Sequence, residues 1–152
     1  MLKITRSIAA AIIVFSLVSC SNSKSLSSKN VEEIFSLNSA PCQTSCPAFE
    51  LSLYGDKTLI FIGEENTALN GRHKQTLTDE QFEALLGIIE TADWATLNDN
   101  YQSKVQNLPT QKFTYNRNGI NKRVSRFGGG PESISNLSDA ILKFVEVQVF
   151  NK

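Results

Sequence analysis

An Asn-Gly pair between two alternating segments is the feature that most constrains the fold of this chain. Asn118-Gly119 is the residue pair preferred for a two-residue type I′ hairpin turn, since both positions need a positive φ. The flanking segments 112–117 and 120–127 alternate in polarity, and the turn sets Phe113 opposite Val124. The other face of this hairpin is polar. We therefore expect two antiparallel strands with one packed face and one solvated face.

A second hairpin is predicted around Gly55-Asp56. Residues 48–62 alternate on both sides of this pair, and Gly in the first position of a two-residue loop suits a tight turn. That register sets Leu51 opposite Ile60 on a largely apolar face. The other face is mixed, and its larger members are a candidate interaction surface: Tyr54, Leu59 and Phe61.

Two helices and one more strand complete the expected fold. Thr78 to Gln81 fits a capping box, followed by an apolar stripe at helical spacing. A second helical stripe follows Pro131, but Ser138 interrupts it where another apolar residue would fit. Segment 71–77 is predicted to be an edge strand. The expected class is α+β, an antiparallel sheet of four to five strands, including two β-hairpins, with two helices packed on one face.

The N-terminus predicts export and lipid anchoring. Lys3 and Arg6 precede a short apolar run at 8–18, as in secretory signals. The four residues that end at Cys20 resemble the lipobox of bacterial lipoproteins; an ordinary signal peptide with a chance Cys is the alternative. We expect a signal peptide at 1–19, a lipidated Cys20 with a flexible tether at 20–35, and a single α+β domain at 36–152.

Location and partners follow from the same region. By resemblance to enterobacterial sorting, Ser21 favours the outer membrane, and the tether lacks an acidic cluster, so the periplasmic side is expected. Two of the 15 basic residues precede Cys20, which leaves 13 against 15 acidic residues. Nucleic-acid binding usually needs a basic excess and is not expected. The expected membrane partner is the lipid bilayer, reached through the acylated Cys20.

Cys42 and Cys46 remain as a pair once Cys20 is lipidated, and a disulfide is expected in an exported protein. A redox pair is the alternative, although redox sites prefer two intervening residues and a following helix. A metal site is weaker still, because only His73 could join the two thiolates.

A set of motifs spread along the chain occurs in a recognisable order: Cys42, Cys46-Pro47, Leu51, Leu53 to Asp56, Gly63, Trp94, Leu97, Tyr101, Pro109-Thr110 and Asn118-Gly119. Together these residues resemble a known family, the domain of unknown function 6438, over roughly Ser36 to Val145. The resemblance implies domain boundaries and no mechanism. In that family pattern an Asp often stands near the position of Asn107.

The search for chemistry leaves two functional hypotheses. The first is a non-enzymatic envelope binding module that contacts an envelope protein or a cell-wall partner. Lys112 and Arg123 share the wet face of the second hairpin and extend its candidate surface, which is also explained as a solvated sheet face. The second is an enzyme or small-ligand binder whose site forms only in three dimensions, around Tyr101, Asn107 and His73. No catalytic residue, metal or cofactor is predicted, and a purely structural spacer is a third possibility.

Overall fold

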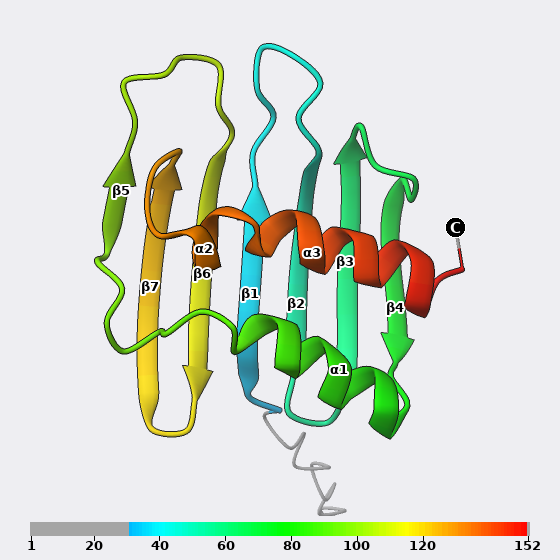
Figure 1. Cartoon of the computed structure of the whole chain (residues 1–152). Helices are drawn as coiled ribbons and strands as arrows, with labels where there is room; N and C mark the ends of the chain where they lie inside the picture. Colours follow the sequence, from blue (N-terminus) through cyan, green and yellow to red (C-terminus); the bar gives the residue numbers. More distant parts are fainter. Residues whose placement is uncertain (1–30, 152) are drawn as a thin grey trace, which may run out of the picture.

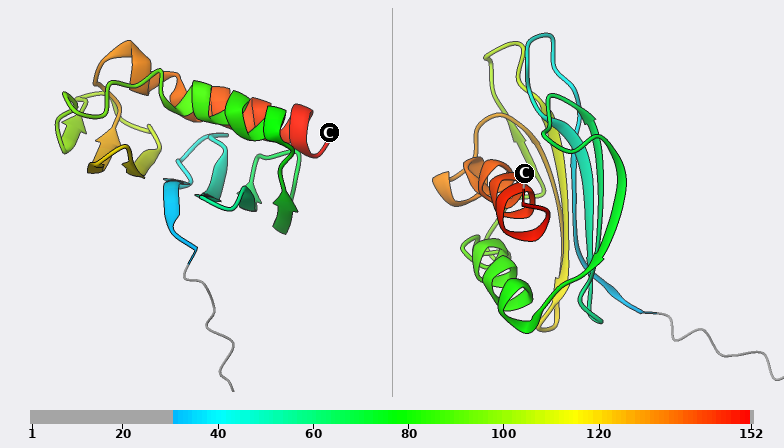
Figure 2. Two further views of the ribbon diagram at one scale, coloured as in Figure 1. Left: turned by 90° about the horizontal axis from the view of Figure 1, so that it is seen from below. Right: turned by 90° about the vertical axis from the view of Figure 1, so that its right-hand side faces the viewer.

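The computed structural model describes residues 31–151, which form one α+β layer pair: a sheet with helices on one face only (Figures 1 and 2). Its seven strands lie in the order β4-β3-β2-β1-β6-β7-β5. All neighbours are antiparallel except β5 and β7, which are parallel. The strands are β1 (Glu33–Ser39), β2 (Ala48–Tyr54), β3 (Thr58–Glu65), β4 (Gly71–Thr76), β5 (Asn100–Gln102), β6 (Thr110–Arg117) and β7 (Ile120–Phe127).

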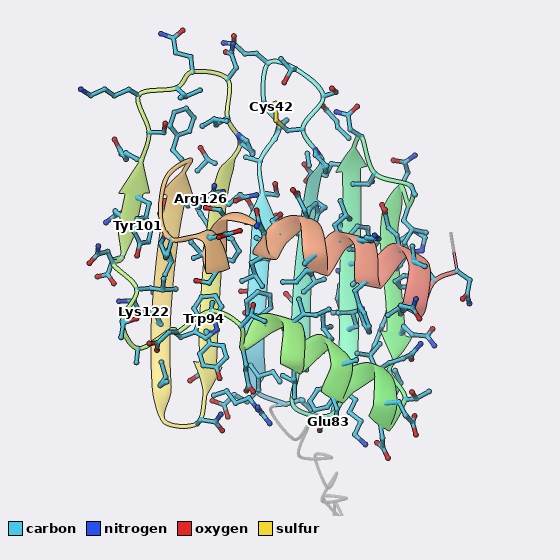
Figure 3. The ribbon with its side chains drawn as sticks, in the orientation of Figure 1. Cys42, Glu83, Trp94, Tyr101, Lys122 and Arg126 are labelled. Atoms are coloured by element: carbon cyan, nitrogen blue, oxygen red, sulfur yellow. A yellow bond between two sulfur atoms is a disulfide. The ribbon has the colours of Figure 1, made fainter. Side chains whose placement is uncertain are left out.

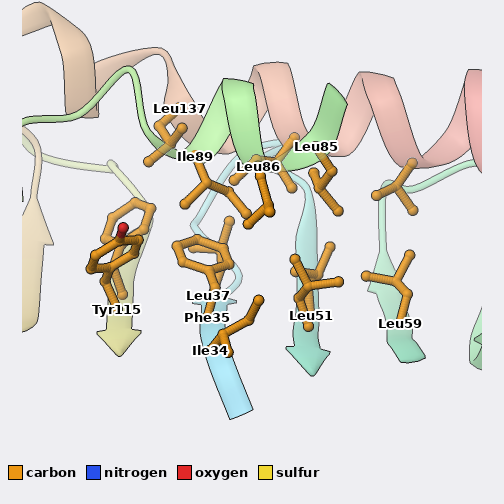
Figure 4. Close-up of a cluster of buried hydrophobic side chains, with 14 of the residues drawn as sticks. Ile34, Phe35, Leu37, Leu51, Leu59, Leu85, Leu86, Ile89, Tyr115 and Leu137 are labelled. Carbon is orange, nitrogen blue, oxygen red and sulfur yellow. The ribbon is translucent and has the colours of Figure 1, made fainter. Parts of the chain in front are cut away.

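The helices cross the sheet in front of its central strands (Figure 1). Their hydrophobic stripes face the sheet, where the side chains of both layers meet in one core (Figure 4). In residues 31–151, no helix is long and apolar enough to cross a membrane. The helical segments are α1 (Asp79–Ile89), α2 (Glu132–Ser135), α3 (Leu137–Phe144) and a π-helical turn, η1 (Val145–Val149).

The expected α+β class, the mostly antiparallel sheet and the two main helices are confirmed, but the predicted strand count is wrong. The sheet has seven strands because β1 and β5 were missed. β1 lies at the centre and joins the two hairpins, pairing with β2 on one side and β6 on the other. β5 has only three residues, too few to show a period. The expected edge strand at 71–77 is confirmed as β4, which ends at Thr76.

The start of β1 also corrects the predicted domain boundary. Ile34 and Phe35 are buried in the core, so the folded domain begins at Glu33 and not at residue 36. Residues 33–35, which were predicted to belong to the tether, belong to β1. The predicted signal peptide at 1–19, the acylated Cys20 and the rest of the tether lie outside the described residues.

The Asn118-Gly119 hairpin and the capping box are confirmed. Phe113 pairs with Val124, and both turn residues have positive φ, 56° for Asn118 and 75° for Gly119. Thr78 accepts a hydrogen bond from the backbone of Gln81, whose side chain in turn accepts one from the backbone N–H of Thr78. These local patterns needed no tertiary information, because turn geometry and capping act within a few residues.

The predicted register of the first hairpin is wrong by one residue. Leu51 pairs with Phe61, and Leu53 with Leu59, because the turn contains one more residue than expected: Lys57, with a φ of 67°. A shift of one residue moves every side chain of a strand to the other face. Leu59 and Phe61 therefore point into the core, while Ile60 faces outward.

Trp94, in the segment that follows α1, packs against aromatic side chains of β1 and β6. Its ring stacks on Tyr115 at a centroid distance of 5.0 Å, and its edge meets Phe35 at 5.9 Å. The indole N–H donates to the carbonyl of Ile89 at 2.9 Å, so the polar atom of this buried ring is satisfied. Trp94 thus fixes the irregular segment after α1 to the central strands.

The two ends of the sheet differ. The β1–β2 loop with Cys42 and the β5–β6 loop lie together at one end, here called the disulfide pole (Figure 3). β1 starts at the opposite end of the sheet (Figure 1). The chain therefore reaches the domain at the end away from the disulfide pole.

Candidate binding sites on the two faces of the sheet

The predicted disulfide is confirmed. Cys42 and Cys46 are bonded, with their Cα atoms 5.6 Å apart. The bridge closes the β1–β2 loop between Pro41 and Pro47, two residues that cannot donate a backbone hydrogen bond. The disulfide thus restricts a loop that regular backbone pairing does not hold.

The enzyme site predicted around Tyr101, Asn107 and His73 is not formed. Tyr101 lies on β5 and His73 on β4, and these are the two opposite edges of the sheet. The ring nitrogen Nε2 of His73 lies 2.9 Å from the carbonyl of Asn70, and the ring packs edge-on against Phe150. His73 has a local structural role, and this part of the second hypothesis is overturned.

The face of the sheet without helices, here called the open face, is largely polar. Its centre is a shallow groove of about 250 Å³ between larger flanking side chains. Short hydroxyl side chains on the middle strands leave this groove between the longer side chains that flank it. One row across six strands, from β7 to β4, contains Arg123, Thr114, Ser36, Ser52, Ile60 and Lys74.

The predicted interaction surface is wrong for two of its five residues. Leu59 and Phe61 are both 0 % exposed and belong to the core, for the reason of register given above. Tyr54 does lie on the open face, where it lines a hollow of about 190 Å³ together with Ile60 and Val31. On β3 the outward-facing aliphatic residue is therefore Ile60, which lies between the two predicted residues Leu59 and Phe61.

Lys112 and Arg123 do share the open face. Lys112 pairs with Ser125 and Arg123 with Thr114, so the two cations are diagonal neighbours on β6 and β7. Both are exposed. Within the described residues neither forms an ion pair, whereas the neighbouring Lys122, on the helix-covered face, pairs with Asp99 at 2.7 Å. The open face thus carries two adjacent positive charges that form no ion pair with another described residue, although Glu50 lies in the same cross-strand row as Lys112.

A row of polar side chains also crosses the helix-covered face at the disulfide pole. Ser39, Gln111 and Arg126 are successive cross-strand partners on β1, β6 and β7. Nη1 of Arg126 donates to Oε1 of Gln111 at 2.6 Å, and Nε donates to the carbonyl of Gly129 at 2.8 Å. Burial lowers the pKa of Arg126, and the charge of Asp139 partly offsets this.

This polar row borders a cleft of about 230 Å³ between the sheet, the N-terminal end of α3 and the loops of the disulfide pole. Sequence segments that are far apart meet here. The lining residues are Ser39, Cys46, Pro47, Pro109, Gln111, Ser138 and Asp139.

Sequence reasoning missed Ser39 and Gln111 as site residues. Each stands at a core-facing position of a strand, but only the pairing of β1 with β6 makes them neighbours. The one available signal was Ser138, which breaks the apolar stripe of the C-terminal helix. Ser138 is 2 % exposed and lies at the cleft.

The fold and these surfaces define a one-sheet α+β domain with a polar open face and a small cleft under its C-terminal helix. The chain belongs to the family described as Domain of unknown function (DUF6438), whose model matches residues 33–145. The match begins at the first residue of β1 and ends at the first residue of η1. No curated protein matches the chain.

Proposed function

We propose that this chain is a bacterial envelope lipoprotein whose folded domain is a non-catalytic binding module. In this proposal the acylated Cys20 anchors the chain to the bilayer, on the periplasmic side of the outer membrane. The support is the N-terminal pattern of Lys3, Arg6, the apolar run at 8–18 and Cys20. The position of the start of β1 adds support, because it lies at the end of the sheet opposite to the disulfide pole (Figure 1).

Lys112 and Arg123 are the reason for proposing the open face as the contact surface. Two adjacent exposed cations that form no ion pair within residues 31–151 attract an acidic partner and steer its approach, and a nearby acidic group would neutralise them in the complex. The groove beside them offers hydroxyl groups from Thr114, Ser36 and Ser52 for hydrogen bonds, while Glu33 and Glu50, which also line it, direct the acidic groups towards the two cations. The proposed partner therefore presents acidic groups, which envelope proteins and cell-wall polymers both supply.

In-cell crosslinking tests the surface. A photo-crosslinking residue at Thr114 on the open face should capture a specific partner, whereas one at Glu83, exposed on α1, should not. Digestion of the cell wall separates the two partner classes, because only a polymer adduct is released by it. The same experiment with Cys20→Ala tests the anchor, since this variant should lose both membrane association and the adduct.

Charge reversal provides the matched control. Lys112→Glu with Arg123→Glu should abolish the adduct at Thr114. Lys104→Glu with Lys143→Glu makes the same change in net charge at exposed positions off the open face, and should leave it intact. Equal capture by both double variants, or equal capture from Thr114 and Glu83, would exclude the open face as the contact surface.

A further inference from the structure

The cleft at the disulfide pole collects the polar side chains that this fold buries. Within the described part of the chain, the buried polar residues are Ser39, Gln111 and Ser138, at 3 %, 5 % and 2 % exposure. All three line this one cleft. Burial of polar groups costs free energy unless they find partners, and these three lie beside one opening in the surface and not deep in the apolar core.

The amide of Gln111 is oriented with its donor free. A guanidinium group only donates, so the atom that accepts the bond from Arg126 must be Oε1. The amide nitrogen Nε2 then lies on the other side of the group, and it has no hydrogen bond to another described residue. Gln111, which lines the cleft, therefore has two N–H donors without a partner among the described residues.

The two serines complete the set. The hydroxyl of Ser39 donates to the carbonyl of Pro47 at 3.0 Å, which leaves its oxygen as an acceptor. The Ser138 hydroxyl, on α3, has no partner among residues 31–151 and can both donate and accept. No described side-chain polar atom is sealed from solvent without a partner. The Ser138 hydroxyl therefore keeps some accessible surface, and Ser138 lines the cleft.

The charges and walls of the cleft restrict the ligand. Asp139 is exposed beside it and repels anions, and the opposite charge of Arg126, which donates to Gln111 and Gly129, is partly offset by that of Asp139. Cys46, Pro47 and Pro109 supply an apolar wall on which the C–H face of a ring can pack. The volume of about 230 Å³ is below that of most sites for drug-sized molecules, so the cleft suits a fragment of one ring.

We propose that this cleft, formed by Ser39, Gln111, Ser138 and Asp139, binds a neutral hydroxyl-bearing ligand of about one sugar ring. Each hydroxyl group of such a ligand donates and accepts, which matches the mixed donors and acceptors of the cleft. The site lies on the opposite side of the sheet from the open face, so it does not rest on the acidic partner proposed above.

The test uses the full-length chain with four probes: glucose, galactose, N-acetylglucosamine and the anionic sugar glucuronate. Ligand-observed NMR titration should give saturable binding of at least one neutral sugar. Glucuronate should bind about tenfold more weakly or worse, because of Asp139. Binding should also shift the side-chain amide resonances of Gln111, which face the cleft.

Two variants separate binding from folding. Ser138→Ala removes only the unpartnered hydroxyl, so its thermal stability should match that of the wild type while its affinity falls about tenfold. Asp139→Asn, at an exposed position, should reduce the difference in affinity between the neutral sugar and glucuronate. Ser133→Ala, on α2 and outside the cleft, is the control and should bind as the wild type does.

The proposal is overturned by any of three results with folded protein. The first is no saturable binding of any neutral sugar, which would leave water as the occupant of the cleft. The second is binding that Ser138→Ala does not weaken, and the third is a preference for glucuronate. Loss of partner capture in the crosslinking experiment has no bearing on this site, since that experiment probes the other face.

Discussion

Oε1 of Gln111 accepts a 2.6 Å hydrogen bond from Nη1 of Arg126, its cross-strand neighbour on β7. This contact holds a half-buried guanidinium group in place at the edge of the cleft and sets the direction of the Gln111 amide. Arg126 on β7 thus orients the amide donor of Gln111 on β6, and both side chains lie on the helix-covered face of the sheet.

Gln111→Ala should lower the free energy of unfolding by about 1–3 kcal/mol, because it leaves the Arg126 guanidinium without its side-chain acceptor. Urea unfolding measures the change. Lys112→Ala, one residue further along β6 and exposed on the open face, is the control and should change stability little. If the two variants were equally stable, the bond to Arg126 would contribute nothing to folding.

The register of the first hairpin predicts opposite behaviour for two neighbouring residues. Leu59→Ser should destabilise the domain by about 3 kcal/mol or more, because it removes a fully buried side chain and adds a hydroxyl group to the core. Ile60→Ser, on the half-buried open face, should cost markedly less. Chemical denaturation of both variants decides the point, since the two-residue turn would reverse their order.

Gly63 is predicted to be intolerant of any side chain. A Cβ atom there would overlap the backbone carbonyl of Leu69, which cannot move aside as a flexible side chain could. Gly63→Ala should therefore cost about 1–3 kcal/mol through overpacking. Gly87→Ala is the matched control: nothing lies near its Cβ position on α1, and Ala should stabilise the helix by up to about 1 kcal/mol. Thermal unfolding should move in opposite directions for the two variants.

Tyr115 predicts a loss of stability at alkaline pH. Burial raises the pKa of its hydroxyl, and the charge of Glu90 adds to the effect. Below the ordinary tyrosine pKa of about 10, both folded and unfolded states are neutral and the full stability is present. As the pH rises above that value the unfolded state ionises first, so stability falls until the pH passes the raised pKa of the folded state.

The comparison with Tyr115→Phe isolates this effect. Phe keeps the ring that stacks on Trp94 but cannot ionise. From about pH 9 to about pH 11, the wild type should lose more unfolding free energy than the variant. Parallel curves for the two proteins would assign the alkaline loss to other groups.

Local sequence patterns were sufficient to predict the elements whose causes lie within a few residues. Asn118-Gly119 fixed the register of the second hairpin, Thr78 and Gln81 fixed the start of α1, and the cysteine count left Cys42 and Cys46 as the expected disulfide pair. In each case the interacting groups are within a few residues of one another. Turn preference, capping and loop closure therefore act in any tertiary context.

The other features of the fold and of the candidate sites depend on contacts between distant parts of the chain. The central place of β1 depends on two partners that are distant in the chain, and the extra turn residue Lys57 put Leu59 rather than Ile60 in the core. The tertiary structure also places His73 and Tyr101 on opposite edges of the sheet, and it brings Ser39, Gln111 and Ser138 to one cleft. These outcomes depend on which strands pair and on a register of one residue, and both are set by the burial of side chains between sheet and helices.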